Sequence, residues 1–348
     1  MPKWLLCSLL AILSPCAGAS PHANAKGVQV KVDEAHQRVN VTIDGMPFTA
    51  YVWPGTLKKP VLFPLIAPDG TEVTRGYPLV PHPGERVDHP HHAGMWFNYG
   101  NVNGFDFWNN SDAIQPEKRS KMGSIYQRKI LSARSGPDEG ELAVESVWVT
   151  GENQEILEQT TRYVFARRRD ERVIDEVTTL KAIDRVVFND DKEGLFGLRV
   201  AHFLESPTEK GGIFRDANGV ATKVADSSLP GATGVYLTSE GKKGDAVWST
   251  RGRWCTLTGH TGDHIATIAI LDHPENPGYP TYWHARGYGL FAANPLGRSI
   301  FDPGAPPFNF TLEKGRSATF RYRVILFSRN VPADEINRDA DAFAGEYR

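Results

Sequence analysis

The sequence predicts an all-β protein, a large antiparallel β-sandwich that ends in one short helix. Gly (33) and Pro (24) are frequent among the 348 residues, as in chains with many turns between short strands. Many segments alternate apolar and polar residues, which is the pattern of a strand with one buried face. Hydrophobic residues make up 40% of the chain, enough for a substantial core.

Alternating segments with strand character occur along almost the whole chain. Two of the longest are joined by a charged link at residues 166–171, which indicates an antiparallel hairpin. Strands in this number, with long loops between them, are typical of a large sandwich. The predicted strands are, in chain order, residues 28–32, 39–43, 125–132, 141–149, 158–165, 172–182, 194–204, 265–271, 287–294 and 317–327.

One segment near the C-terminus has helical periodicity instead. Pro332 is suited to open a helix, and Ile336, Ala340 and Phe343 then fall on one face. We therefore expect a helix within residues 332–345. No internal repeat or low-complexity linker marks a domain boundary, so residues 20–348 are expected to form a single β-sandwich domain.

The first 19 residues have the pattern of a secretory signal peptide. Lys3 supplies a positive charge, residues 4–13 form an apolar run, and residues 17–19 are a small-residue cleavage site. A second cleavage site lies at residues 23–25. The apolar run is shorter than the roughly 20 residues that span a bilayer. We therefore expect an exported protein, periplasmic or extracellular, with no membrane contact after cleavage.

Charge and cysteine content exclude several classes of protein. Lys and Arg (39) nearly balance Asp and Glu (41), so the chain lacks the basic surface of a dedicated nucleic-acid binder. After signal cleavage Cys255 is the only cysteine, so an internal disulfide is excluded. Cys255 lies in a strand-like run and is expected to be a core residue, not a nucleophile.

The segment at residues 86–108 concentrates residue types that are found in functional sites. It holds three histidines, and Pro90 restricts its neighbours to extended conformations. An extended chain directs His89 and His91 to one side and His92 to the other. Two imidazoles on one side are suited to bind a metal, or to serve one substrate as acid and hydrogen-bond donor.

Other side chains of this segment suit a sugar-binding site. Trp96 and Trp108 fit either the core or a platform on which a sugar ring stacks. Short or charged side chains nearby provide hydrogen-bonding groups. The candidates of this second kind are Arg86, Asp88, Asn103 and Asp106.

A second candidate segment begins at Tyr282 and reads YWHARGYGLFAANPLG. As a strand it places His284, Arg286 and Tyr288 on one face. A stripe of these side chains is costly to bury unless a ligand or other polar groups face it. We therefore expect this stripe to contribute to a site.

A third candidate segment begins at Lys192 and reads KEGLFGLRVAHF. In a regular strand Glu193 and Arg199 share one face, either as a structural ion pair or with Glu193 as a partly buried general base. His202 shares the opposite face with apolar residues and is expected to be a core histidine.

Together the segments DHPHHAGMWFNYGNVNGFDFW, KEGLFGLRVAHF and YWHARGYGLFAANPLG resemble those of a secreted bacterial family of unknown function labelled "methane oxygenase PmoA-like". The match runs in order over most of the mature chain. The resemblance implies an exported β-sandwich protein with a fold similar to the galactose-mutarotase-like supersandwich of many sugar-active enzymes. It supplies no catalytic residues, so the site candidates depend on the residues themselves.

These observations favour a carbohydrate-active enzyme, a lyase, epimerase or hydrolase, with a small-molecule or oligosaccharide substrate. Histidines would move protons beside a carboxylate, and arginines would hold hydroxyls, carboxylates or a developing oxyanion. The expected proton-transfer groups are His89, His91, His284, Glu193 and Asp106, and the expected substrate contacts are Arg86, Asp88, Trp96, Asn103, Trp108, Arg199, Arg286 and Tyr288.

Two alternatives remain open. One is a metal enzyme, including an oxygenase as the family label suggests, with a divalent ion such as zinc, copper or iron on His89, His91 and His92. The other is a non-catalytic glycan-binding protein, which needs the tryptophans and arginines but not the histidines. Beyond such a divalent metal, the cofactor is left unknown by the sequence.

Overall fold

The computed structural model describes residues 26–168, 170–226 and 231–347, together with Met1. Apart from Met1, the expected signal peptide at residues 1–19 and both cleavage sites lie outside the described residues. Export therefore stays a prediction, as does the single domain over residues 20–348. In the described part of the chain, no helix is long and apolar enough to cross a membrane.

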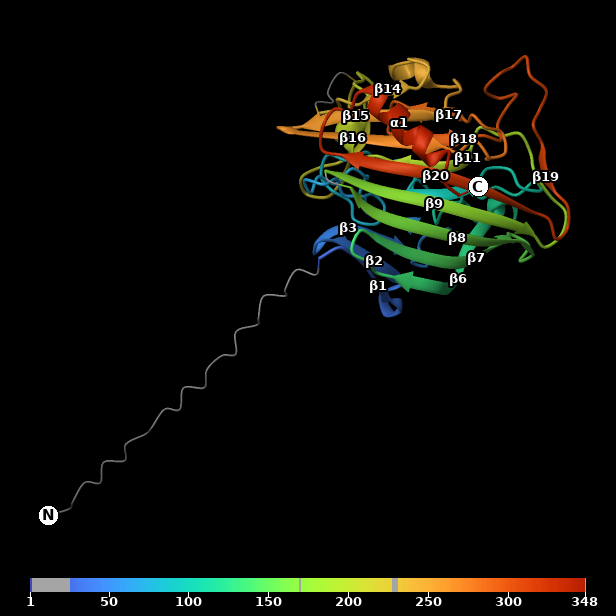
Figure 1. The fold of residues 1–348 in the computed structure, drawn as a ribbon, viewed down its shortest axis with the longest axis horizontal. Coiled ribbons are helices and arrows are strands. Elements are labelled where there is room, and N and C mark those ends of the chain that lie inside the picture. Colours follow the sequence, from blue (N-terminus) through green and yellow to red (C-terminus); the bar gives the residue numbers. More distant parts are fainter. Residues whose placement is uncertain (2–25, 169, 227–230, 348) are drawn as a thin grey trace.

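Two large sheets face each other and form a sandwich, which confirms the predicted all-β class (Figure 1). The first sheet has eight strands in the spatial order β1 (Val28–Asp33), β2 (Arg38–Ile43), β3 (Met46–Val52), β4 (Val61–Leu62), β5 (Met95–Tyr99), β11 (Gly194–Arg199), β18 (Leu290–Asn294) and β17 (Tyr282–Arg286). The second sheet also has eight strands, in the order β14 (Val235–Thr238), β15 (Trp254–Thr261), β16 (His264–Asp272), β20 (Ser317–Phe327), β9 (Glu171–Ala182), β8 (Glu155–Arg168), β7 (Glu139–Thr150) and β6 (Gly123–Arg134).

Shorter elements complete the described chain. Two small antiparallel sheets of two strands each are formed by β10 (Val186–Phe188) with β19 (Phe310–Leu312) and by β12 (Gly212–Arg215) with β13 (Ala221–Val224). The helical elements are the 3-10 helices η1 (Glu34–His36), η2 (Pro116–Lys121), η3 (His202–Leu204) and η4 (Gly244–Val247), and the α-helix α1 (Ala333–Phe343).

Most predicted strands coincide with observed strands to within a few residues. The link at residues 166–171 is a hairpin between β8 and β9, whose strands extend further toward the turn than expected. Strand β11 ends at Arg199, not at residue 204, because the chain then enters η3. Strand β18 begins only at Leu290, because residues 287–289 form the turn after β17, with Gly289 at a φ of +92°.

The two sheets bury one large hydrophobic core between them. Rings from facing strands meet there, since the ring centroid of Phe97 (β5) lies 5.6 Å from that of Phe320 (β20). The centroid of Phe196 (β11) lies 4.6 Å from that of Tyr322 (β20). Burial of one such aromatic side chain stabilises the fold by about 2–3 kcal/mol. Cys255 (β15) is fully buried in this core, as expected.

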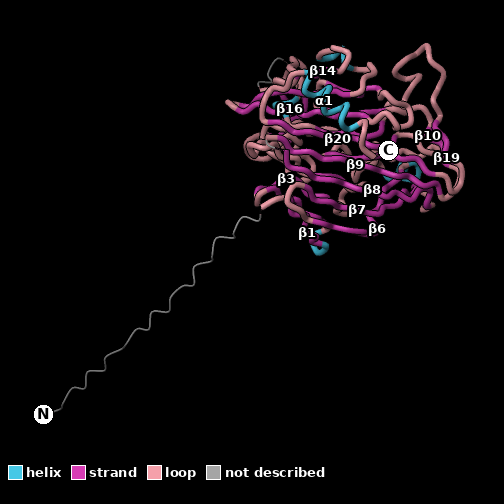
Figure 2. Tube along the Cα trace, in the orientation of Figure 1, coloured by secondary structure: helices cyan, strands magenta, loops and turns pink. Residues whose placement is uncertain are grey.

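The outer face of the second sheet is covered by α1, the α-helix of the described chain (Figures 1 and 2). The predicted apolar face is confirmed, because Ile336, Ala340 and Phe343 are buried in a cluster that includes Ile325 of β20. Pro332 precedes the first helical residue, where its missing N–H leaves no hydrogen bond unmade.

The outer face of the first sheet positions the candidate site, and we call it the site face. The strand register aligns Trp96 (β5), Gly197 (β11), Ala292 (β18) and His284 (β17) in one row across four neighbouring strands. Phe196 points into the core, and side chains alternate along a strand, so this row points away from the core. Rigid strands therefore support the loops that carry the candidate residues.

Candidate functional site

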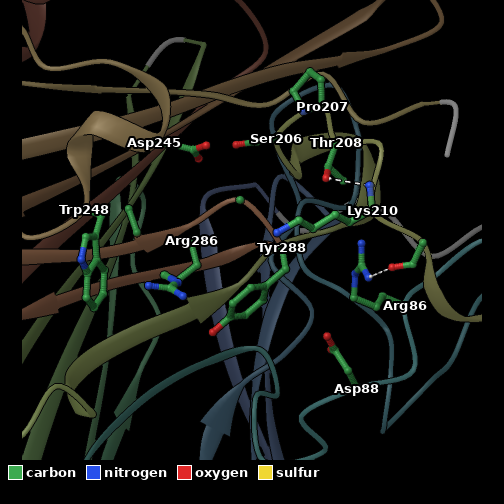
Figure 3. Close-up of a pocket in the computed structure, with 13 residues that line it drawn as sticks. Arg86, Asp88, Ser206, Pro207, Thr208, Lys210, Asp245, Trp248, Arg286 and Tyr288 are labelled. Atoms are coloured by element: carbon green, nitrogen blue, oxygen red, sulfur yellow. Dashed lines mark hydrogen bonds between the residues drawn. The ribbon is translucent and has the colours of Figure 1, made fainter. Parts of the chain in front are cut away.

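A pocket of about 600 Å³ lies at the end of β17 (Figure 3). Small-molecule sites typically have volumes of about 300 to 1,000 Å³, so the pocket has a suitable size. Part of its lining comes from the loop between Ser206 and Gly211, and part from Asp245 and Trp248 at η4. Four predicted substrate contacts also line it, namely Arg86, Asp88, Arg286 and Tyr288.

The loop with the three histidines forms a tight turn, not the extended chain that was expected. The His92 amide donates a hydrogen bond to the His89 carbonyl oxygen (2.9 Å), and Pro90 occupies a turn position that suits its fixed φ. The turn pairs His89 with His92, whose ring centroids lie 4.9 Å apart with planes 4° apart. His89 has a φ of +41°, a strained conformation that is typical of functional sites.

Arg75, which no sequence pattern indicates, holds this turn in place. Its guanidinium donates hydrogen bonds to the backbone carbonyl oxygens of Arg86, Asp88, His89 and His92 at distances of 2.9–3.1 Å. It also donates to the Asp88 carboxylate at 2.6 Å. Because Arg75 is 1% exposed, these bonds are shielded from water and fix the turn.

Asp88 lies between two buried arginines and next to His89. Its Oδ1 accepts hydrogen bonds from Arg75 and Arg199, both at 2.6 Å, and its Oδ2 lies 3.1 Å from Nδ1 of His89. Burial raises the pKa of Asp88, but His89 and the two guanidinium charges outweigh burial and hold the pKa well below its usual range. Asp88 is therefore an ionised carboxylate beside the His89 ring.

Tyr288 connects the pocket to the histidine turn. It lies in the turn after β17, not on the strand with His284 and Arg286 as expected. Its ring nevertheless stacks on His89, with centroids 5.0 Å apart and planes 3° apart. The Arg199 guanidinium lies 4.9 Å from the Tyr288 ring centroid in a cation–π contact. Burial raises the pKa of Tyr288 to about 12, so its hydroxyl is protonated at neutral pH.

His92 is a buried residue with a structural role. Its Nε2 accepts a hydrogen bond from the Trp108 indole N–H (3.1 Å), because an indole nitrogen only donates. Burial lowers the pKa of His92 well below the usual value, so the ring is neutral.

The expected metal site on His89, His91 and His92 is not formed. Three ligands must direct nitrogen atoms at one point, but the rings of His89 and His92 lie face to face. In the parts of the chain that the structure describes, no group of three or more His, Cys, Asp or Glu side chains is arranged to hold a metal ion. The donor atoms present therefore do not fit the metal-enzyme hypothesis.

Lys59 is a buried cation next to the turn, and it too follows no sequence pattern. It is 5% exposed, donates a hydrogen bond to the His91 carbonyl oxygen (2.6 Å) and lies 5.2 Å from the Trp96 ring centroid. Burial lowers the pKa of Lys59 to about 7. Burial also lowers the pKa of His91 to about 2, so this imidazole is neutral at physiological pH.

Trp96 and Trp108 are buried among the side chains that pack on the site face, so they do not form a platform for a sugar ring. They are 2% and 1% exposed, and their ring centroids lie 5.3 Å apart. Gly197 makes room for both, because a Cβ there would lie 2.8 Å from Cζ2 of Trp96 and 3.2 Å from Cη2 of Trp108. Arg199 is also completely buried. Trp96, Trp108 and Arg199 were predicted to contact substrate, but all three are buried beneath the site and do not line the pocket.

Glu193 and His284 form a separate cluster. Oε2 of Glu193 lies 3.9 Å from Nδ1 of His284, too far for a hydrogen bond, and Glu193 forms an ion pair with Lys192. Burial lowers the pKa of His284 to about 3 and raises the pKa of Glu193. Trp248, which lines the pocket, packs edge-on against His284 at 4.8 Å. His284 thus packs against Trp248, and the catalytic roles of His284 and Glu193 stay predictions.

Asp106 and Asn103 are used by the fold and do not line the pocket. Oδ1 of Asp106 accepts hydrogen bonds from the backbone amides of Trp108 and Asn109, both at 2.9 Å, which holds the turn that carries Trp108. Asn103 is exposed and bonds to the backbone of Val187 at 2.8 Å. Turn-forming residues of this kind resemble binding residues in a sequence, because the same side chains serve both purposes.

Arg199 and Glu193 do not form the structural ion pair that was one of the two alternatives for them. Glu193 precedes β11, whereas Arg199 at its end lies 3.9 Å from Glu205, a buried carboxylate that no sequence pattern indicates. Glu205 is 1% exposed and also lies 3.4 Å from Arg86 and 3.3 Å from Nδ1 of His202. His202 is therefore a partly buried histidine with a polar partner, in η3 and not in a strand.

Comparison with known proteins gives a family for this site and fold. Residues 38–341 match the family described as "Family of unknown function (DUF6807)". The chain belongs to this family. The PmoA-like label is not part of that description and stays a prediction. No curated protein matches the DUF6807 chain.

Solved structures show a distant likeness to the DUF6807 chain. The GH36 alpha-galactosidase AgaA from Geobacillus stearothermophilus is 14% identical, with 82% of this chain and 40% of that chain covered and a TM-score of 0.35. Galactose 1-epimerase from Lactobacillus acidophilus NCFM is 10% identical, with 87% and 98% covered and a TM-score of 0.36. The DUF6807 chain thus spans less than half the length of that alpha-galactosidase. At these values the likeness carries no argument about the site.

Proposed function

We propose that the protein is a carbohydrate-active enzyme in which His89 transfers a proton to or from a sugar bound in the pocket. One observation carries the proposal: His89 touches two residues that line the pocket. Its ring stacks on Tyr288 with centroids 5.0 Å apart, and its Nδ1 lies 3.1 Å from the Asp88 carboxylate. An imidazole beside an ionised carboxylate is a common arrangement for general acid–base catalysis.

His89 is an accessible histidine of the site. Its side chain is 40% exposed, whereas that of His284 is 3% exposed and His92 is buried. The carboxylate of Asp88 favours a proton on Nδ1, which leaves Nε2 of a neutral ring as the proton acceptor. Nδ1 of His89 forms no hydrogen bond among the described residues, and catalytic contacts often tighten only when substrate binds.

The pocket lining suits a sugar ring. Tyr288 and Trp248 offer aromatic surface to the C–H groups of a sugar. Ser206, Thr208 and Asp245 offer hydroxyl and carboxylate groups to its hydroxyls. A few polar groups around an apolar wall fix the orientation of a small polar ligand, which is the first requirement for proton transfer at one carbon or oxygen.

The proposal covers a lyase, an epimerase or a hydrolase, because each of these reactions needs a positioned proton donor or acceptor. General acid–base catalysis by one side chain contributes about 10²–10⁴-fold to a rate. The secretion signal expected at residues 1–19 belongs to the proposal, since export would bring the pocket to extracellular or periplasmic glycans.

The test compares the His89→Asn and His264→Asn variants of the full mature chain. His264 is a matched control, because its Nδ1 lies 2.9 Å from Asp69 and its side chain is 60% exposed, at an equivalent His–Asp pair outside the pocket. Turnover is measured on a panel of neutral and acidic oligosaccharides by chromatography of the products. We expect a loss of about 100-fold or more for His89→Asn and none for His264→Asn, with unfolding temperatures close to that of the wild type.

Two results would overturn the proposal. Full turnover by His89→Asn would remove the proton-transfer role of His89. Sugar binding by the wild type without turnover of any sugar on the panel, and unchanged in His89→Asn, would favour the non-catalytic glycan-binding hypothesis instead.

A further inference from the structure

We infer that the pocket selects a sugar that carries an oxyanion, in the simplest case the carboxylate of a sugar acid. The inference rests on the proposed function and names the substrate class of the same pocket. The observation behind it is an excess of positive charge around the space that the sugar would occupy.

The lining carboxylates do not balance the lining cations. Asp88 is already engaged, because it contacts Arg75 and Arg199 at 2.6 Å from the buried side. Glu205 lies behind the lining and contacts Arg86 at 3.4 Å. Counted with these buried partners, five cationic side chains surround three carboxylates, which leaves two positive charges uncompensated. The charged groups that line the pocket itself are Arg86, Lys210, Arg286, Asp88 and Asp245.

Arg286 has the geometry of an anion ligand. Its guanidinium lies 4.5 Å from the Trp248 ring centroid, and this cation–π contact restricts the guanidinium plane. Within the described residues, Arg286 forms no ion pair with a carboxylate and is exposed into the pocket. A guanidinium with a fixed plane presents paired N–H donors that match the two oxygens of a carboxylate.

Lys210 supplies a second cation from the opposite wall. Figure 3 shows its side chain extending toward Tyr288, with the ammonium between Arg286 and Arg86 in this view. Among the residues described, Lys210 also has no carboxylate within ion-pair distance. Cations that converge on one space repel one another, and an anionic ligand relieves that repulsion.

Charge, and not the aromatic surface, distinguishes this substrate class from a neutral sugar. Stacking on Tyr288 or Trp248 serves neutral and acidic sugars equally, because it involves the C–H face of the ring. Only an anionic substituent pairs its charge with the cations of Arg286 and Lys210. Hydrogen bonds to charged groups correspond to about 10-fold or more in affinity.

The test is calorimetric titration of the full chain with galacturonate and glucuronate, their neutral methyl esters, and a sulfated galactose. We expect each acid to bind about 10-fold or more tightly than its methyl ester, with a preference that falls as salt is added. The double variant Arg286→Gln, Lys210→Gln should lose this preference, since both side chains are exposed and their loss leaves the fold intact. Lys129→Gln, an exposed control on β6 outside the pocket, should keep it.

The outcomes separate this inference from the proposed function. Equal affinity for acid and methyl ester would overturn the inference. Tighter binding of the sulfated sugar than of either acid would support the oxyanion site and assign the oxyanion to a sulfate. Turnover of neutral sugars that depends on His89, without any preference for acids, would overturn the inference and leave the proposed function standing. Acid-selective binding with full turnover by His89→Asn would support the inference and overturn the proposed function.

Discussion

Replacement of Lys59 by methionine is expected to stabilise the fold below neutral pH. Burial lowers the pKa of Lys59 from 10.5 to about 7, which means that the folded chain disfavours the ammonium form. At about 1.4 kcal/mol per pH unit, this difference corresponds to at most about 5 kcal/mol. Methionine keeps a long side chain but loses the hydrogen bond to the His91 carbonyl oxygen, at a cost of about 1–2 kcal/mol. We therefore expect a net gain of at most about 3–4 kcal/mol at pH 6.

The gain must depend on pH in one direction. Below about pH 7 both the folded and the unfolded chain carry the ammonium, so the wild type bears the full cost of burying it. Between about 7 and 10.5 the folded chain has released this proton and the unfolded chain has not, so wild-type stability rises with pH. Above 10.5 both states are neutral, and Lys59→Met differs from the wild type only by the lost hydrogen bond.

Urea unfolding of both proteins at pH 6 and pH 10 measures this difference. Lys58→Met is the matched control, because Lys58 is the neighbouring lysine and forms an ion pair with Asp112 at 2.5 Å near the surface. Its effect on stability should be small at both pH values. A Lys59→Met protein that is less stable than the wild type at pH 6, or equally shifted at both pH values, would refute the cost assigned to the buried ammonium.

Three further substitutions test other parts of the structure. Gly197→Ala places a Cβ 2.8 Å from the Trp96 ring and should cost about 1–3 kcal/mol in urea unfolding, with altered tryptophan fluorescence; unchanged fluorescence and stability would contradict the packing described. Asp88→Asn removes the charge shared by two buried arginines and should cost about 3–5 kcal/mol, and a thermal unfolding curve like that of the wild type would count against it. Burial raises the pKa of Glu176 from 4.5 to about 8, so the stability it contributes is complete below pH 4.5 and is lost as the pH rises through 8. Glu176→Gln should therefore be less sensitive to pH than the wild type when urea unfolding at pH 5 and pH 9 is compared, and equal sensitivity would argue against a buried neutral carboxyl.

The strands were predictable because their signal is local. Alternation with a period of two requires only a core on one side, and β20 begins and ends at the predicted residues 317 and 327. The errors fall where a distant or irregular contact decides the outcome. Gly289 with its positive φ ends the strand pattern after β17, and the turn at Pro90 replaces an extended chain because Arg75 binds the carbonyl oxygens on both sides of it.

The segments that carry the candidate site were predictable from the sequence, but the residues that contact these segments were not. Histidine, aspartate and arginine within one segment indicate a site because the fold alone rarely needs them together. Arg75, Lys59 and Glu205 are single residues in unremarkable surroundings, and only the folded chain brings them to the histidine turn. The burial of Trp96 likewise depends on a glycine in the neighbouring strand, and strand pairing is not encoded by either segment alone.

Several destabilising features occur together around the histidine turn. His89 has a φ of +41°, Lys59 is a buried ammonium, and the Nε atoms of Arg75 and Arg199 are buried without a hydrogen-bond partner among the described residues. Each costs on the order of 1–3 kcal/mol, which the large core between the sheets offsets. Arg75 and Arg199 bind Asp88, and Lys59 binds the backbone of the turn at His91. Under the proposed function, substitutions that relieve these costs should therefore stabilise the protein and reduce turnover. A variant of this turn that is more stable and keeps full turnover would show that these destabilising features are not required for the proposed function.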